Sequence, residues 1–215
     1  MNEISVFTTN GDAKTRGGPA ADGLRSYLRS RTAKAHAQLD ARFASIAARP
    51  EASDYHRFVL MNLTAYRGLS AFLAAQSIET APDLKTSVDA DLQRLETDAA
   101  AMGLDGTATA DFVLAPYGPT EAAGVTYVLD GSKLGARFIH RRLEMAGMIA
   151  PRSGISTEFL GAAFDAPAMG TSSDALAAVA GAYESAAEAA LATFALFERS
   201  LDRVVAARRE EHLSR

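Results

Sequence analysis

Residues 119–147 read PTEAAGVTYVLDGSKLGARFIHRRLEMAG, and this stretch decides the expected fold. Pro119 suits the first turn of a helix, and a glycine stands at the far end, so we expect one long helix. The stretch nevertheless holds three internal glycines, Gly124, Gly131 and Gly135. Each costs a helix roughly 0.5–1 kcal/mol relative to alanine. In a chain with 45 alanines, such a bare stretch of backbone needs a reason.

The spacing of the glycines places them on one face of this helix. Gly131 and Gly135 are four residues apart, and Gly124, Tyr127 and Phe138 fall on or beside the same face. Two explanations fit a bare backbone with apolar flanks. Another helix packs closely against it, or a flat ligand lies against it. Spacing alone favours close helix packing but does not decide between them.

The rest of the chain also favours helices. Apolar residues recur at steps of three and four from Leu24 to Ile46, which is typical of an amphipathic helix. We expect an all-α fold, a compact multi-helix bundle of five to seven helices. A single domain over 22–215 would follow a disordered leader over 1–21. Further helices are expected over 54–74, 82–103, 119–147, 156–163 and 174–212, with a first helix over 22–49.

Composition excludes several classes of protein. The chain has 215 residues, a net charge of −4 and no cysteine. It lacks the basic excess of a nucleic-acid binder, and it cannot form disulfides or thiolate metal sites. No apolar run is long enough for a transmembrane helix, and the N-terminal residues lack the apolar core of a secretory signal. We therefore expect a cytoplasmic protein with no nucleic-acid or membrane partner.

His36 is the candidate ligand among the four histidines. It follows Thr32 by four residues and precedes Leu39 by three, so it faces the apolar stripe of its helix. It is either a core histidine with a satisfied nitrogen or an imidazole presented to an iron porphyrin. Arg29, two turns earlier, either belongs to a solvated basic face or pairs with a carboxylate. We expect His56 and His140 to lie on the surface.

Two motifs resemble the bacterial heme oxygenases, including the type found with bacteriophytochromes. LRSRTAKAHAQLD over 28–40 resembles the proximal helix of that family, and GVTYVLDGSKLGA over 124–136 resembles its distal helix. The stretches Tyr55–Leu60 and Phe194–Leu201 resemble further helices. The resemblance spans about 24–147 and 183–205.

This resemblance implies heme as substrate and cofactor, and its cleavage to biliverdin, carbon monoxide and ferrous iron with oxygen and external electrons. His36 would be the proximal ligand of the heme iron. Gly131 and Gly135 would let the distal backbone approach the iron, with Ser132 beside the oxygen site. The implied heme contacts are Arg29 and Tyr127 at a propionate, and Phe138. The electron donor would be of the ferredoxin or reductase type, and a bacteriophytochrome or another signalling protein is a possible partner.

The chain also departs from the family. An arginine- and aromatic-containing segment that usually precedes the final helices is replaced by APAMGTSS over 166–173. The alternative is therefore a catalytically inactive heme-oxygenase-like module that regulates or binds another protein. Arg137, Arg141 and Arg142 form a basic patch that either faces such a partner or is a solvated helix face.

Overall fold

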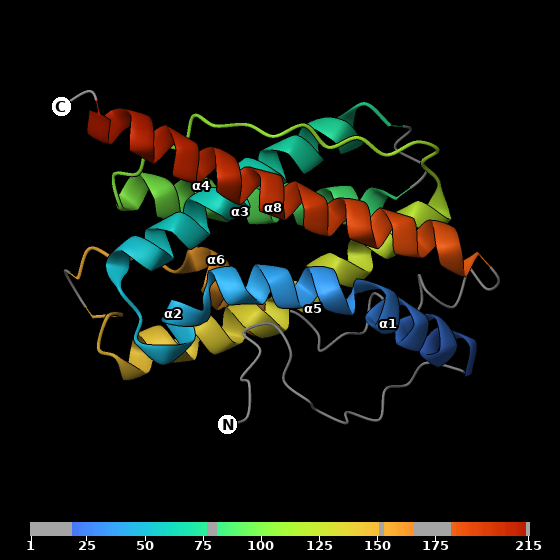
Figure 1. Ribbon diagram of the computed structural model, residues 1–215, viewed down its shortest axis with the longest axis horizontal. Helices are drawn as coiled ribbons and strands as arrows, with labels where there is room; N and C mark the ends of the chain where they lie inside the picture. Colours follow the sequence, from blue (N-terminus) through green and yellow to red (C-terminus); the bar gives the residue numbers. More distant parts are fainter. Residues whose placement is uncertain (1–18, 77–80, 151–152, 166–181, 214–215) are drawn as a thin grey trace.

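The computed structural model describes residues 19–76, 81–150, 153–165 and 182–213 (Figure 1). Within these ranges the protein is all-α and has no strand, which confirms the expected fold class. Its seven helices are α1 (Pro19–Arg42), α2 (Ala44–Ala48), α3 (Ala52–Ala74), α4 (Pro82–Ala101), α5 (Pro119–Met145), α6 (Glu158–Asp165) and α8 (Tyr183–Leu213).

The helix boundaries agree with the sequence patterns except near the N-terminus and at the start of the last helix. Helix α8 begins at Tyr183 and residue 182 is not helical, while residues 174–181 of the expected helix lie outside the described residues. Helix α1 begins at Pro19, three residues before the start expected from the sequence, and residues 1–18 of the expected leader lie outside the described residues. The first predicted helix is also two helices, because α1 ends at Arg42 and α2 begins at Ala44. Phe43 stands between them with non-helical backbone angles and a fully buried ring. Burial of this ring accompanies the change in direction of the chain.

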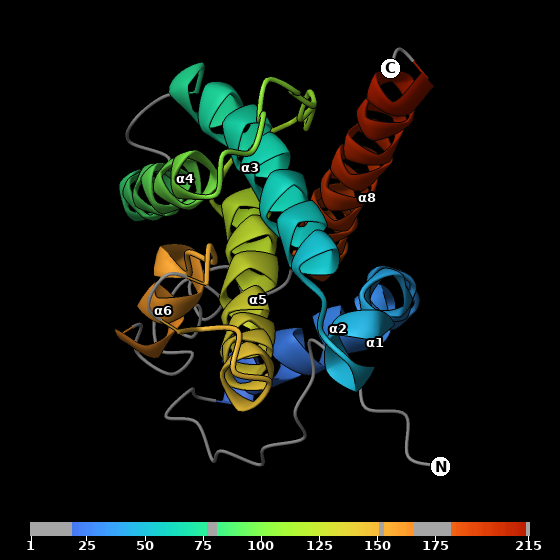
Figure 2. The ribbon, with the colours of Figure 1, turned by 90° about the vertical axis from the view of Figure 1, so that its left-hand side faces the viewer.

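Helix α8 is the longest of the described helices, and three of the other six pack against it. It contacts α1, α3 and α5, while α4 lies on α3, and α6 lies against α5 and α4. Figure 2 shows α5 in the middle of the molecule, with α1 and α2 on one side and α4 and α6 on the other. Helix α5, with its glycines, therefore has one flank toward α1 and another toward α4 and α6.

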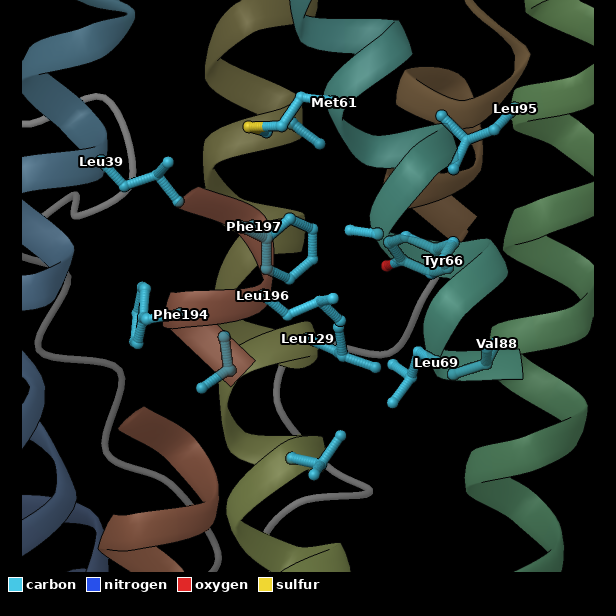
Figure 3. Packing of buried hydrophobic residues seen from close by; sticks show 14 of the residues in the cluster. Leu39, Met61, Tyr66, Leu69, Val88, Leu95, Leu129, Phe194, Leu196 and Phe197 are labelled. Carbon is cyan, nitrogen blue, oxygen red and sulfur yellow. The ribbon is translucent and has the colours of Figure 1, made fainter. Parts of the chain in front are cut away.

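The core lies where α3, α5 and α8 meet. Tyr66 of α3 is almost fully buried, and its ring packs edge-on against Phe159 of α6 and Phe197 of α8. Figure 3 shows Phe197 pointing from α8 toward Tyr66, while Phe194 points from α8 toward α1. Two phenylalanines three residues apart thus serve two different helix contacts.

An extended segment over 102–118 crosses the outside of α3 and α8 (Figure 1). Its residues alternate between exposed and covered positions, and Ala110 and Phe112 are buried. The carbonyl of Ala110 lies so close to Gly68 of α3 that a β-carbon built there would be 1.8 Å from its oxygen. Arg199 donates to the carbonyl of Asp111 at 3.1 Å, and thereby ties the segment to α8.

No helix in the described ranges has the length and apolar character needed to cross a membrane.

Candidate functional site

Helices α1 and α5 face each other through Thr32 and Tyr127. Burial raises the pKa of Tyr127, and hydrogen bonding with the Thr32 hydroxyl acts in the opposite direction. The positive charges of Arg29 and Arg25 also lower this pKa, so both guanidinium groups lie near the phenol. Thr32 itself donates to the carbonyl of Leu28 at 2.8 Å. The expected neighbours Arg29 and Tyr127 are therefore brought together, at one end of the interface between the two helices.

His36 lies one turn further along α1 and is held by two neighbours. Its Nδ1 is 3.3 Å from Oδ2 of Asp40, one turn later on the same helix. Its ring centroid is 5.6 Å from that of Phe194 of α8, with the ring planes 67° apart. The imidazole is 21 % exposed and the Asp40 carboxylate 9 % exposed. An Asp40 contact at Nδ1 selects the tautomer in which Nε2 carries the lone pair.

The glycines of α5 have different surroundings, which separates the two explanations left open by the sequence. A β-carbon built at Gly124 would lie 2.1 Å from the carbonyl oxygen of Ala186, so this glycine permits close packing of α8. A β-carbon built at Gly131 has no atom within 4 Å, so open space adjoins the backbone there. Gly135 is buried. Gly124 therefore serves helix packing, whereas Gly131 borders a space that a ligand could fill.

His36 and Gly131 each lie one turn beyond the residues through which α1 and α5 meet. Figure 1 shows α1 and α5 crossing each other, and α2 contacts the end of α5, where Arg142 donates to the carbonyl of Ala48. One turn beyond Thr32 on α1 is His36, and one turn beyond Tyr127 on α5 is Gly131. The imidazole and the open backbone thus both lie on the α2 side of the Thr32–Tyr127 contact.

Ser132 lies on a different side of α5 from Gly131. Its hydroxyl donates to the carbonyl of Leu129 at 2.6 Å, and the side chain lines a cavity of about 20 Å³ between α3, α4, α5 and α6. A cavity of this size holds roughly one water molecule. Its lining consists of Tyr66, Asp91, Ser132, Lys133, Ala136, Phe159, Ala162 and Ala163.

Tyr66 is the polar neighbour of Ser132 in this cavity. Burial raises its pKa well above the ordinary value for tyrosine, and the negative charge of Asp91 adds to this increase. Hydrogen bonding with Ser132 acts in the opposite direction. Burial likewise raises the pKa of Asp91, while the positive charges of Lys133 and Arg94 lower it. This cavity therefore combines two hydroxyl groups with a carboxylate whose charged form is disfavoured.

The other residues singled out in the sequence contact side chains or backbone within the protein. Phe138 is half-buried against the core. In the basic patch, Arg137 donates to the carbonyl of Ala163 at 2.6 Å, and Arg141 lies 5.9 Å from the ring of Phe164. His140 is half-buried, with its ring 5.2 Å from that of Phe164, and is not the surface residue that the sequence suggested.

His56 differs from its expected position in the same way. It is half-buried, and burial together with the positive charge of Arg208 lowers its pKa. The side chain of His212 and the segment 166–173, which departs from the family pattern, lie outside the described residues.

Sequence reasoning missed Tyr66 and Asp91 as neighbours of Ser132. Tyr66 reads as one more residue of the apolar stripe of its helix, and Asp91 as an exposed charge. Nothing in the sequence of α3 or α4 indicates that Tyr66 and Asp91 lie close together. The pairing arises because α3 and α4 pack side by side against the same part of the bundle as α5.

Comparisons with known proteins add no identification: no family model matches the chain, and no curated protein and no solved structure is significantly similar to it.

Proposed function

We propose that the protein binds heme between α1 and α5 and cleaves it to biliverdin, carbon monoxide and ferrous iron. Oxygen would be the oxidant, and the electrons would come from a ferredoxin or a reductase. One observation carries the proposal. His36, its Nδ1 next to Asp40, and Gly131, where the backbone of α5 borders open space, each lie one turn beyond the Thr32–Tyr127 contact that joins the two helices.

The residues present fit a porphyrin on three counts. An imidazole with a carboxylate at Nδ1 is a suitable axial ligand for iron. A glycine without a neighbour within 4 Å lets a flat ring approach the helix backbone. Arg29 lies two turns before His36, and Tyr127 lies one turn before Gly131. Together they offer a cation and a hydroxyl to a carboxylate group. These three features complement the three parts of a heme: its iron, its flat face and its acidic edge.

Each residue has a defined task in this proposal. His36 would hold the iron through Nε2, and Asp40 would accept a hydrogen bond from Nδ1–H, which fixes the tautomer and increases the basicity of the ligand. Gly131 keeps side-chain atoms away from the opposite face. Heme itself supplies the redox chemistry, as a cofactor does, whereas the protein provides binding and orientation. Ser132 borders the water-sized cavity with Tyr66 on another side of α5, so this proposal gives it no contact with the heme.

A spectrophotometric titration of the protein with hemin tests the proposal. We expect a sharp Soret band that saturates at about one heme per chain, followed by biliverdin and carbon monoxide when a reductant is added in air. His36→Ala should lose the imidazole-ligated spectrum and the turnover. His140→Ala is the matched control, because His140 is half-buried beside Phe164 and should leave both unchanged. Biliverdin formation by the His36 variant at the wild-type rate would contradict the assignment.

A titration in which the spectrum remains that of free hemin would remove the enzyme function. The inactive heme-oxygenase-like module would then become the better interpretation. The internal contacts of Arg137 and Arg142 already occupy much of the basic patch that this alternative would use for a partner.

A further inference from the structure

We infer that Phe194 of α8 is a positioning residue that sets the rotation of the His36 imidazole. The inference rests on the proposed function, because it concerns the ring that would bind iron. It adds a residue from a third helix to a site otherwise formed by α1 and α5. The observation behind it is the edge-on contact of the two rings, 5.6 Å between centroids and 67° between planes.

One contact alone does not fix an imidazole. The Asp40 carboxylate, 3.3 Å from Nδ1, holds one corner of the ring but still allows the ring to tilt by rotation about its Cβ–Cγ bond. The Phe194 ring, at 67° to the imidazole, blocks that swing on the side facing α8. Such T-shaped pairs are a preferred arrangement of aromatic rings. The two contacts together restrict the plane of the imidazole.

Phe194 is itself held firmly enough to act in this way. It is 6 % exposed and belongs to the main hydrophobic core, where α8 packs on α1. In Figure 3 its side chain extends from α8 toward the ribbon of α1, on the side where Leu39 also lies. A ring locked in the core is a rigid support for a ligand on the neighbouring helix.

The same helix supplies a matched control. Phe197 is 4 % exposed and lies three residues further along α8, but its ring packs against Tyr66, 6.1 Å between centroids. Figure 3 shows the two phenylalanines leaving α8 toward different neighbours. Phe194→Leu and Phe197→Leu therefore remove similar amounts of buried ring, and only the first removes the contact with His36.

The experiment loads both variants and the wild type with hemin, reduces them without oxygen, and records the iron–imidazole stretching band by resonance Raman spectroscopy. We expect a shifted and broadened band for Phe194→Leu and the wild-type band for Phe197→Leu, because only the former frees the imidazole plane. Phe194→Met, which fills the site with a flexible apolar chain, should show the same shift. Circular dichroism verifies that each variant is folded. If Phe194→Leu is misfolded, the Raman band of Phe194→Met tests the inference instead.

The His36 ring protons in the hemin-free protein provide an independent readout. Their chemical shifts in the wild type include the ring current of Phe194, so they should move in Phe194→Leu and stay in place in Phe197→Leu. Wild-type protein that binds hemin, with the same Raman band in all variants, would overturn this inference and leave the proposed function standing. Wild-type protein that binds no hemin would overturn both.

Discussion

Asp98 shows at the scale of one residue how a buried charge organises its surroundings. Its side chain is fully buried at the end of α4 and accepts three hydrogen bonds from the start of α6. The donors are the Ser156 hydroxyl at 2.6 Å and the backbone N–H groups of Glu158 and Phe159 at 2.8 and 3.0 Å. Tyr55 adds a bond from its hydroxyl to the carbonyl of Ser156. The carboxylate thus caps α6 and ties it to α4, while Tyr55 ties the same turn to α3.

We predict that Asp98→Asn destabilises the protein by about 3 kcal/mol, within the range for disrupting bonds to a buried charged group. The amide keeps the shape of the side chain, but its NH₂ group faces N–H donors and cannot accept from them. Urea unfolding at neutral pH measures the loss. Asp165→Asn, at an exposed position at the end of α6, is the control and should change the free energy of unfolding by less than about 0.5 kcal/mol. Equal effects of the two changes would contradict the capping role.

The sequence predicts the position and contacts of some of these residues and not of others. His36 could be found, because its spacing from Thr32 and Leu39 placed it on the inner face of its helix. The contact with Asp40 is equally local, since the two residues are one turn apart. Asp98 and Tyr66 could not be found, because their partners lie on other helices and far along the chain.

Helix α5 shows at the scale of an element why a sequence can contain costly glycines for two reasons at once. Gly124 admits the backbone of α8, whereas Gly131 borders open space. The sequence predicted that the bare face had a purpose but left helix packing and ligand binding as alternatives. It could not separate them, because the neighbours of a helix face depend on the tertiary arrangement. These two glycines should therefore respond to the same substitution in opposite directions.

Gly124→Ala is expected to destabilise the protein by about 2 kcal/mol or more, the scale of overpacking a tight core contact. The added β-carbon would lie 2.1 Å from the carbonyl oxygen of Ala186, so α8 must move away from α5. The gain in helix propensity, about 1 kcal/mol, is too small to offset this. Thermal unfolding followed by circular dichroism measures the change, and a stabilised variant would show that the two helices do not meet as described.

Gly131→Ala is expected to stabilise the hemin-free protein by about 0.5–1 kcal/mol, because the methyl group meets nothing and the helix loses a flexible residue. Under the proposed function the same methyl group enters the space opposite His36. We therefore expect weaker hemin binding in a protein that is more stable without hemin. The same unfolding assay, together with a hemin titration, tests both halves. Unchanged hemin affinity would place the ligand elsewhere.

At the scale of the whole molecule, the order of the helices could be predicted and their packing could not. Periodicity, prolines and glycines marked most boundaries, and the missed break at Phe43 has its cause in the burial of that ring. Between the helices expected over 82–103 and 119–147 the sequence predicted no regular element, yet the segment over 102–118 packs along α3 and α8. What directs it there is Gly68, whose missing side chain makes room for the carbonyl of Ala110. A lone glycine within a helical pattern does not reveal its neighbour.

The buried tyrosines make the stability of the whole protein depend on pH above about pH 10. Burial raises the pKa of Tyr55, Tyr66 and Tyr127, and it raises that of Tyr117 to about 12. In the unfolded chain a tyrosine loses its proton near pH 10. The unfolded state therefore binds fewer protons than the folded state above this pH. The stability that depends on neutral tyrosines is complete below about pH 10 and declines as the pH rises further.

Tyr117 allows this decline to be tested at one position. Its hydroxyl oxygen is buried and has no hydrogen-bond partner in the described part of the chain, while its ring packs edge-on against Phe72, 5.1 Å between centroids. Tyr117→Phe keeps the ring and removes the hydroxyl, so at pH 7 the free energy of unfolding should stay the same or rise by up to about 1 kcal/mol. At pH 11 the variant should exceed the wild type by a larger margin, since the unfolded wild type gains a tyrosinate at this position and the variant cannot. Urea unfolding at both pH values measures the margin. If it is equal at pH 7 and pH 11, burial of the Tyr117 hydroxyl does not contribute to the alkaline loss, and the remaining buried tyrosines must account for it.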